Sequence, residues 1–301
     1  KRKKPDVIYC AVPSLTAPYY TSKYCAKNKI RFVIDIQDLW PEAFQMVFNI
    51  PILSAIIFAP FKWIENEIYR CANDIVAVSQ TYVDRALSVN IKCKSGYSVF
   101  LGTDIDTFDK NSDKEAVLTK KEGDIWLVYC GTLGSSYDLS CVIEAIKDAG
   151  IDYLKFIVMG DGPHMKKFIN LAQKSNVDAI FTGRLPYDEM CAMLSECDIA
   201  INPIMIGASQ SIINKHADYA MAGLPVISSQ DRGEYSRLLE TYRCGVNCDP
   251  GNVLEVRQAI IELTKNKQKR IEYGKNSRRL AEEKFDRQKT YKTILNVIEQ
   301  R

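Results

Sequence analysis

Histidine is scarce in this sequence, since its 301 residues contain only His164 and His216. No GxSxG turn occurs, so the sequence argues against a Ser–His–Asp hydrolase. The ten cysteines form neither a CxxC pair nor a regular framework, which argues against a zinc domain and against a disulfide-stapled secreted domain. Several cysteines, such as Cys10 and Cys130, lie in apolar runs and behave as small hydrophobic residues. We therefore expect the reducing environment of the cytoplasm.

An excess of one charge sign is also lacking, because the formal net charge is only +3. This value is too small to indicate a nucleic-acid-binding protein. No P-loop occurs, and Gly160-Asp161-Gly162 begins like a GxGxxG fingerprint but has Met165 at the third glycine position. No signal-peptide pattern occurs either, and the chain opens on Lys1, so we expect that upstream sequence is absent.

Residues 43–61 lack any charged side chain. Their length approaches the ~18 apolar residues that suggest a membrane span, but Pro51 interrupts them. We predict a helix before Pro51, a break at Pro51, and an amphipathic helix that continues to about Arg70. Two interpretations stay open for this stretch, namely packing in the core and contact with a membrane surface.

Short apolar runs alternate with amphipathic helical stretches along most of the chain. Runs that are apolar on both faces and separated by helices indicate parallel sheets covered on both sides. We therefore predict an α/β protein with two doubly wound, Rossmann-like domains, the first of them incomplete. The boundary is predicted in the polar segment 107–123, which gives residues 1–108 with a C-terminal helix at 287–301, and residues 109–286. The predicted strands are residues 6–10, 31–35, 74–78, 97–101, 125–130, 154–159, 179–182, 199–202, 225–228 and 245–247.

Glycine-containing loops follow several predicted strands of the second domain, beginning at Gly131, Gly160 and Gly183. Ligands of doubly wound sheets bind where strands end and helices begin, because helix N-termini attract phosphate. The sequence thus predicts a nucleotide site in these loops. Asp104-Ile105-Asp106 forms a DxD pattern at the boundary between domains, a weaker candidate for a metal–diphosphate site.

Three segments resemble the retaining glycosyltransferases of family 4, which have the GT-B fold. Residues 214–226 (NKHADYAMAGLPV) are similar to the family's SKxxEYMAAGxPV stretch. Residues 33–42 (VIDIQDLWPE) resemble the DxRDLWPE signature of bacterial enzymes that build capsule, O-antigen and exopolysaccharide. Residues 100–108 (FLGTDIDTF) resemble the NGVDxxxF hinge. The resemblance covers nearly the whole chain.

The resemblance implies two domains that face one another across a cleft. A sugar would move from a nucleoside diphosphate on the second domain to a glycan or lipid-linked acceptor hydroxyl, with retention and without a metal ion or cofactor. The site would lie in the cytoplasm, with membrane contact at the inner face of the plasma membrane as one option. The implied catalytic residues are Asp38, Lys215 as the diphosphate cation, and Gln210 in place of the family's first Glu. The implied nucleotide-binding residues are Asp218 for the ribose, Gly131, Thr132, Gly160, Ser211, Ile212 and Ile213 near the phosphates, and Arg184 and Leu185 beside the base.

Two residues depart from the family pattern. Asp218 is one methylene shorter than the usual Glu, and Gln210 carries no carboxylate. Two alternatives therefore stay open, a catalytically inactive sugar-nucleotide-binding relative and a GT-B-fold sugar-nucleotide epimerase.

Overall fold

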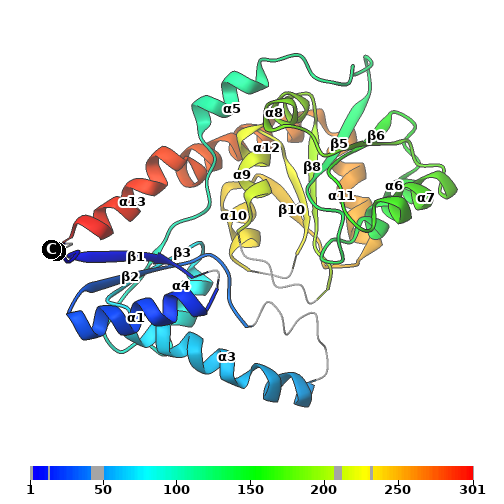
Figure 1. Cartoon of the computed structure of the whole chain (residues 1–301). Coiled ribbons are helices and arrows are strands. Elements are labelled where there is room, and N and C mark those ends of the chain that lie inside the picture. The colour runs from blue at the N-terminus through cyan, green and yellow to red at the C-terminus, as the bar shows by residue number, and fades with distance from the viewer. Residues whose placement is uncertain (1–2, 13, 42–50, 207–211, 231–232, 301) are drawn as a thin grey trace. The chain divides into compact units, whose positions relative to one another are not determined.

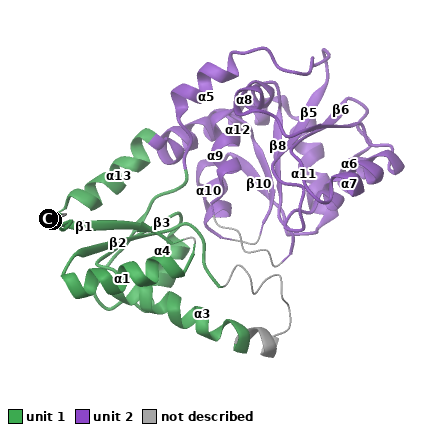
Figure 2. Cartoon of the chain, viewed as in Figure 1, with its two compact units in different colours: residues 1–101, 288–301 green, residues 102–287 purple. Residues whose placement is uncertain are grey.

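A computed structural model of the chain describes residues 3–12, 14–41, 51–206, 212–230 and 233–300. The chain divides into two compact units (Figure 2). Unit 1 comprises residues 1–101 and 288–301, and unit 2 comprises residues 102–287.

Unit 1 is built on a parallel four-stranded sheet in the order β1-β2-β3-β4 (Figure 1). Strand β2 (Arg31–Ile36) is the most buried of the four, because it lies between β1 and β3 and its residues from Phe32 to Ile36 are covered on both faces. One face of the sheet packs on α3 through a core that includes Ile34, Ile75 and Tyr69. The other strands and the helices are β1 (Val7–Ala11), β3 (Asp74–Ala77), β4 (Tyr97–Ser98), α1 (Thr16–Asn28), α3 (Pro51–Cys71), α4 (Gln80–Leu87) and α13 (Arg287–Glu299).

The opposite face of this sheet is covered by the C-terminal helix α13. Val297 is fully buried in a cluster with Val33 and Val76, and Ile294 packs against the same cluster. The sequence shows an apolar helical stripe of Tyr291, Ile294, Leu295 and Ile298. The structure corrects its register, because Leu295 is 54% exposed whereas Val297 is buried.

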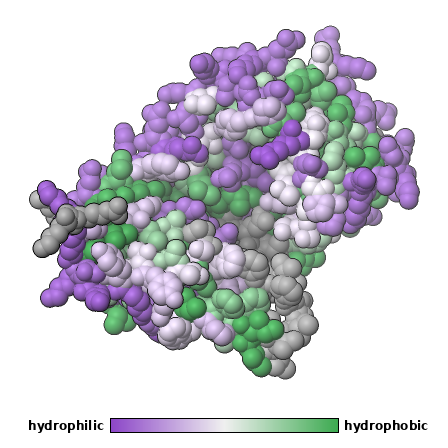
Figure 3. Space-filling model, in the orientation of Figure 1, coloured by the Kyte–Doolittle hydropathy of each residue, from purple (hydrophilic) through white to green (hydrophobic). Residues whose placement is uncertain are grey.

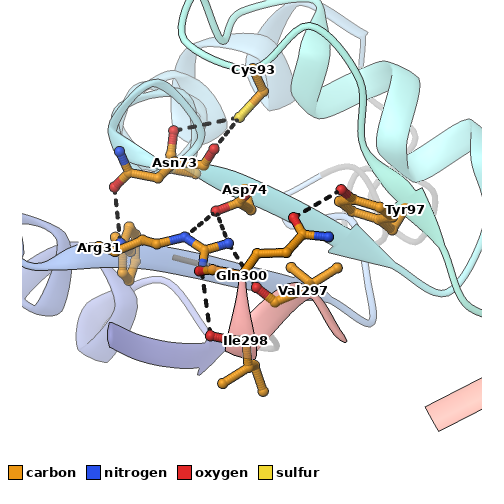
Figure 4. Close-up of polar contacts among 10 residues, drawn as sticks. Arg31, Asn73, Asp74, Cys93, Tyr97, Val297, Ile298 and Gln300 are labelled. Carbon is orange, nitrogen blue, oxygen red and sulfur yellow. Dashed lines mark hydrogen bonds and ion pairs between the residues drawn. The ribbon is translucent and has the colours of Figure 1, made fainter. Parts of the chain in front are cut away.

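Arg31 fixes the last turn of α13 (Figure 4). Its guanidinium donates to the carbonyl oxygens of Val297 at 2.7 Å and Ile298 at 3.4 Å, and also to that of Gln300. The Arg31 Nε donates to Asp74 Oδ2 at 2.8 Å. Because the last carbonyls of a helix have no partner inside the helix, a cation in this place stabilises them.

We expect Arg31→Ala to destabilise the attachment of α13. The lost hydrogen bonds involve a charged group, so the free energy of unfolding should fall by about 1.5–3 kcal/mol. The measurement is urea denaturation combined with hydrogen exchange of the α13 amides. Arg70→Ala is the control, because Arg70 is 51% exposed and pairs only at the surface with Glu67. Unchanged exchange at Ile294 and Val297 in Arg31→Ala would contradict this role.

Unit 2 contains a parallel six-stranded sheet in the order β10-β9-β8-β5-β6-β7. The chain builds outward from β5 in one direction and then returns to place β8 on its other side, which is the doubly wound order. The α/β architecture with parallel sheets that the sequence predicts is confirmed. The strands are β5 (Ile125–Cys130), β6 (Leu154–Met159), β7 (Ala179–Gly183), β8 (Ile199–Pro203), β9 (Val226–Ser229) and β10 (Gly245–Asn247).

Helices lie on both faces of the unit 2 sheet (Figure 1). Alternate side chains of β5 explain this, since Leu127 and Tyr129 belong to the core beneath α6, α7 and α11, while Val128 is buried on the opposite face. The helices are α5 (Ile105–Ser112), α6 (Leu139–Ala149), α7 (Met165–Lys174), α8 (Tyr187–Ser195), α9 (Asn214–Met221), α10 (Glu234–Tyr242), α11 (Val253–Lys265), α12 (Lys267–Leu280) and the π-helix η1 (Ala281–Phe285).

The boundary between the units lies earlier than the sequence predicts. Unit 2 begins at residue 102 rather than 109, and unit 1 resumes at residue 288 rather than 287. Helix α5 belongs to unit 2, where it packs on α8 and buries Phe108. Asp104 caps this helix, because its Oδ1 accepts a hydrogen bond from the Thr107 N–H at 2.8 Å. The first carboxylate of the DxD pattern therefore has a structural role.

Helix α3 starts at Pro51 and ends at Cys71, close to the limits predicted for it. Within the described part of the chain, no helix is long and apolar enough to cross a membrane. Four large side chains of α3, Ile56, Ile57, Phe61 and Trp63, are between 45% and 67% exposed. Core packing does not account for these four residues, and Figure 3 shows hydrophobic surface in this region.

Candidate functional site

Two glycine loops meet at the carboxyl ends of β5 and β6. Gly131 and Gly160 have φ angles of +143° and +148°, which side chains rarely adopt. A Cβ at position 160 would lie 1.9 Å from the Gly131 carbonyl oxygen, so only glycine allows the loops to approach so closely. The Gly160 N–H also donates to Gly183 O at 2.8 Å, which ties the end of β7 to the same place.

A cavity of about 580 Å³ opens where these loops meet. It lies at the carboxyl edge of the sheet, where doubly wound proteins bind their ligands. The structure thus brings together five residues that the sequence placed at the nucleotide site, Gly131, Thr132, Gly160, Arg184 and Leu185. The remaining lining residues are Cys130, Met159, Asp161, Gly162 and Met190.

A larger cavity of about 680 Å³ lies in unit 1. Its lining includes Arg31 and Asp74, which are the first residues of β2 and β3. It therefore lies at the amino edge of that sheet, opposite to the edge at which doubly wound folds bind ligands. We take the smaller cavity in unit 2 as the candidate site on that ground.

Lys215 lies in the first turn of α9, the helix that follows β8. Its side chain reaches Gly131, because a Cβ there would lie 2.9 Å from Lys215 Nζ. The amine also lies over the rings of Tyr129 at 4.2 Å and Tyr137 at 3.7 Å. β5 and β8 are neighbours at which the strand order reverses, so Lys215 and Gly131 flank the switch point of the sheet.

The Lys215 amine is buried without a hydrogen-bond partner among the described residues. The residue is only 8% exposed, and burial lowers the pKa of its amine to about 7. Buried polar groups are nearly always paired in folded proteins, so an unpaired buried amine calls for an explanation. The amine lies beside Gly131, which lines the cavity of unit 2. An anion bound there would supply the missing partner by accepting a hydrogen bond from the amine.

Asp218 lies on α9, one turn after Lys215. Its Oδ1 accepts a hydrogen bond from Thr103 Oγ1 at 2.9 Å. Burial raises the pKa of Asp218 to about 6, while the hydroxyls of Thr103 and Tyr187, together with Arg287, oppose the rise. Asp218 is not among the residues that line the cavity, but the charges of Asp218 and Lys215 both act on Cys130, which lines it.

The structure corrects two expected phosphate contacts. The N–H of Gly131 already donates to Met159 O at 2.9 Å, and that of Ile213 donates to His216 Nδ1 at 3.3 Å. Neither N–H therefore points to a phosphate here, and the contribution of Gly131 is the space that it leaves for the Lys215 amine. Ile212 is buried. Gln210 and Ser211, which the sequence also placed at the site, lie outside the described residues.

Asp38 lies in the bend after β2 of unit 1 and is exposed. Desolvation by the surrounding protein raises the pKa of its carboxyl, and its charge in turn helps to raise the pKa of Tyr82 on α4. Neighbouring Gln37 donates to Asp35 Oδ2 at 3.1 Å. The role expected for Asp38 is contact with a sugar bound on unit 2. The structure describes Asp38 only within unit 1, so this role stays a prediction.

Sequence reasoning missed four side chains at the site, Tyr129, Tyr137, Thr103 and Tyr187. Tyr129 reads as a core residue of a strand, and its ring is indeed fully buried. The other three, Tyr137, Thr103 and Tyr187, lie in segments whose sequence does not indicate which side chain each of them contacts. No pattern in the sequence indicates that Thr103 reaches a carboxylate 115 positions away.

Comparison with known proteins supports one family. Residues 110–280, more than half of the chain, match the family described as glycosyl transferases group 1. The uncharacterized glycosyltransferase MJ1069 of Methanocaldococcus jannaschii is 23% identical over 242 residues, which cover 79% of this chain. The chain spans about 61% of the length of that relative.

Solved structures show the same fold. HepE of Anabaena, in complex with UDP, is similar with a TM-score of 0.79 and 17% identity, over 97% of this chain and 78% of that one. Sucrose-phosphate synthase of Thermosynechococcus elongatus is similar with a TM-score of 0.75 and 14% identity, over 97% of this chain and 72% of that one. The chain has the α/β fold with parallel sheets of the GT-B glycosyltransferases, and it belongs to the group 1 glycosyl transferase family.

Proposed function

We propose that this protein transfers a sugar from a nucleoside diphosphate sugar to an acceptor hydroxyl. The observation that carries the proposal is the buried Lys215 amine beside Gly131, at the switch point of the unit 2 sheet, which has no hydrogen-bond partner among the described residues. A diphosphate supplies the anion that such an amine needs. HepE, whose fold is similar, has been solved with UDP-glucose and with UDP and glucose, which supports this class of donor.

Within this proposal, Lys215 stabilises the leaving diphosphate. The bond between the anomeric carbon and the diphosphate oxygen breaks, and the leaving oxygen gains negative charge. The acceptor oxygen bonds to the anomeric carbon from the same face, and its proton passes to a diphosphate oxygen. The configuration is retained without a protein nucleophile. A cation held in a site of low dielectric lowers the energy of this transition state without reorganisation.

The other residues have supporting roles in the proposal. Asp218 accepts hydrogen bonds from the ribose hydroxyls, and Arg184 and Leu185 pack beside the base at the cavity wall. Asp38 contacts the donor sugar or the acceptor from unit 1. The resemblance also implies roles in donor binding for Gln210 and Ser211, which lie outside the described residues.

We further propose a role in the synthesis of a bacterial surface polysaccharide or glycolipid, on the cytoplasmic side of the membrane. The resemblance of residues 33–42 supports the pathway class, and the ten free cysteines support the compartment. The exposed apolar side chains of α3, including Ile56 and Trp63, suit contact with a membrane surface, where a lipid-linked acceptor would lie.

A panel of UDP-, GDP-, ADP- and dTDP-sugars tests the donor class by thermal shift. We expect the sugar nucleotides of one of the four bases to raise the melting temperature of the protein, since a ligand that binds only the folded state stabilises it. Transfer assays with that donor then separate an enzyme from an inactive binding relative. An epimerase is disfavoured because His216 is buried and stacked on Tyr235, which leaves it unsuited to acid–base chemistry. No stabilisation by any of the four would overturn the proposal.

Chelation supplies a second test, of the proposal that cationic side chains carry the diphosphate. We expect EDTA to leave the transfer rate unchanged, because the positive charge of Lys215 serves in place of a metal ion. The measurement is the initial rate with and without chelator. Complete loss of activity that manganese restores would contradict this, and would direct attention to Asp104 and Asp106.

A further inference from the structure

Asp218 lies beside the place where the two segments that join the units are bonded to each other. Unit 1 ends at Leu101 and resumes at Gln288, so the chain passes between the units twice. Thr103 on the first passage pairs with Asp286 on the second as an isolated parallel bridge. The Thr103 N–H donates to Phe285 O at 2.8 Å, and the Arg287 N–H donates to Thr103 O at 3.0 Å.

The backbone of Thr103 is therefore fixed on both sides. Gly102 makes this approach possible, because a Cβ there would lie 2.4 Å from Phe285 O. Arg287 adds a hydrogen bond from its guanidinium to Gly102 O at 2.9 Å. Thr103 is only 7% exposed, and its hydroxyl is held against Asp218 Oδ1 at 2.9 Å. A side chain on such a fixed backbone can orient its partner.

Tyr187 is the first residue of α8, and its hydroxyl lowers the pKa of Asp218. A carboxylate offers about four acceptor positions on its two oxygens. The Thr103 hydroxyl occupies one of them, which leaves about three for an incoming ligand. Two neighbouring ribose hydroxyls need two. The carboxylate is thus oriented by the protein and still able to bind a diol.

Neighbouring hydroxyls act on the charge of Asp218. Burial raises its pKa to about 6, and the hydroxyls of Thr103 and Tyr187 lower it. The other ionisable groups that face Asp218 are Cys191 on α8, Cys130 on β5 and Arg287 at the start of α13. Removing a hydroxyl donor should therefore leave more of the carboxyl protonated, and a protonated carboxyl is a poorer acceptor for ribose hydroxyls.

We propose that Thr103 is a positioning residue for donor binding, which holds Asp218 ionised and oriented toward the two ribose hydroxyls of the nucleotide. The inference rests on the proposed function, because it takes Asp218 as the ribose ligand. It goes further by giving a binding role to a residue of the segment that joins the two units.

The experiment measures the affinity of the full chain for a sugar nucleotide by calorimetry, from about pH 5 to 8. The probe is the sugar nucleotide selected by the four-base panel, because its diphosphate diester does not change charge in this range. Affinity should fall as the pH drops through the pKa of Asp218. In Thr103→Val, this fall at low pH, the acidic limb of the affinity profile, should move upward by about one pH unit.

A matched variant separates the hydroxyl from general damage to the fold. Thr103→Ser keeps the hydroxyl and should keep the parent profile. Affinity should also fall at alkaline pH, where Lys215 loses its charge, because its pKa is lowered to about 7. This alkaline limb of the profile should stay in place in every variant.

The outcomes distinguish this inference from the proposed function. Weakening of binding by the same factor at every pH, with an unmoved acidic limb, would show a merely structural role and overturn the inference. A parent-like profile in Thr103→Val would do the same. If Asp218→Ala itself binds like the parent, or if no sugar nucleotide binds, the proposed ribose site fails instead.

Discussion

Replacing Lys215 with alanine is expected to lower the transfer rate at saturating donor by about 10²–10³-fold, the usual cost of removing one preorganised electrostatic contact from a transition state. Donor affinity should fall by a smaller factor. The reason is that the charge on the leaving oxygen grows toward the transition state, so the amine stabilises that state more than the bound donor. The measurements are turnover and donor affinity for Lys215→Ala and the parent.

Lys167 provides the matched control. It is also a lysine over an aromatic ring in unit 2, with its amine 5.6 Å from the centre of the Phe168 ring, but it is exposed. Lys167→Ala should keep the parent turnover. If Lys215→Ala and Lys167→Ala behave alike, the diphosphate is not bound at Lys215.

The stability of a Lys215→Met variant should move in the opposite direction from its activity. Methionine keeps the apolar stem among Tyr129 and Tyr137 but removes an amine that has no partner among the described residues, and such a group costs about 1–3 kcal/mol. The pKa of Lys215 is lowered on folding, so the parent loses stability as the pH falls toward about 7. The gain in melting temperature should therefore be larger on the acidic side of neutrality than at alkaline pH. A loss of stability in Lys215→Met would show that the amine already has a partner.

The alternation of apolar runs and helical stretches was sufficient to predict the parallel sheets. Buried strands such as β5 and β8 are apolar on both faces, and this property is visible in sequence because it depends on each strand alone. The place of the domain boundary depends on tertiary packing. Helix α5 has a polar sequence and resembles a linker, yet Phe108 anchors it on unit 2.

The site could be predicted only in part, for the same physical reason. The glycine loops follow strands, and the resemblance of residues 214–226 indicates Lys215 and Asp218. The contacts that these two side chains make involve residues that are distant in sequence. Lys215 meets Tyr129 across the switch point, and Asp218 meets Thr103 where two chain segments are bonded to each other. Periodicity reports which face of an element is buried, but not which residue lies opposite it.

Asp218→Ala should weaken the binding of the nucleotide itself. A carboxylate that accepts hydrogen bonds from two ribose hydroxyls makes charge-assisted contacts, so its removal should lower affinity by about one to two orders of magnitude. Turnover at saturating donor should change less, because the ribose hydroxyls do not gain charge during transfer. The measurement is the affinity for the sugar nucleotide by calorimetry, with turnover measured in parallel.

Two further variants show whether the charge or the shape of Asp218 matters. Asp218→Asn keeps the size of the side chain, and it should bind with intermediate affinity and lose the fall in affinity that the parent shows as the pH drops through about 6. Asp188→Ala removes a carboxylate that pairs with Lys114 at the surface and should leave binding unchanged. The Thr103 hydroxyl loses its acceptor in Asp218→Ala, so the melting curve of this variant must show a folded protein before affinities are compared. If the folded variant binds nucleotide as tightly as the parent, the ribose lies elsewhere in unit 2.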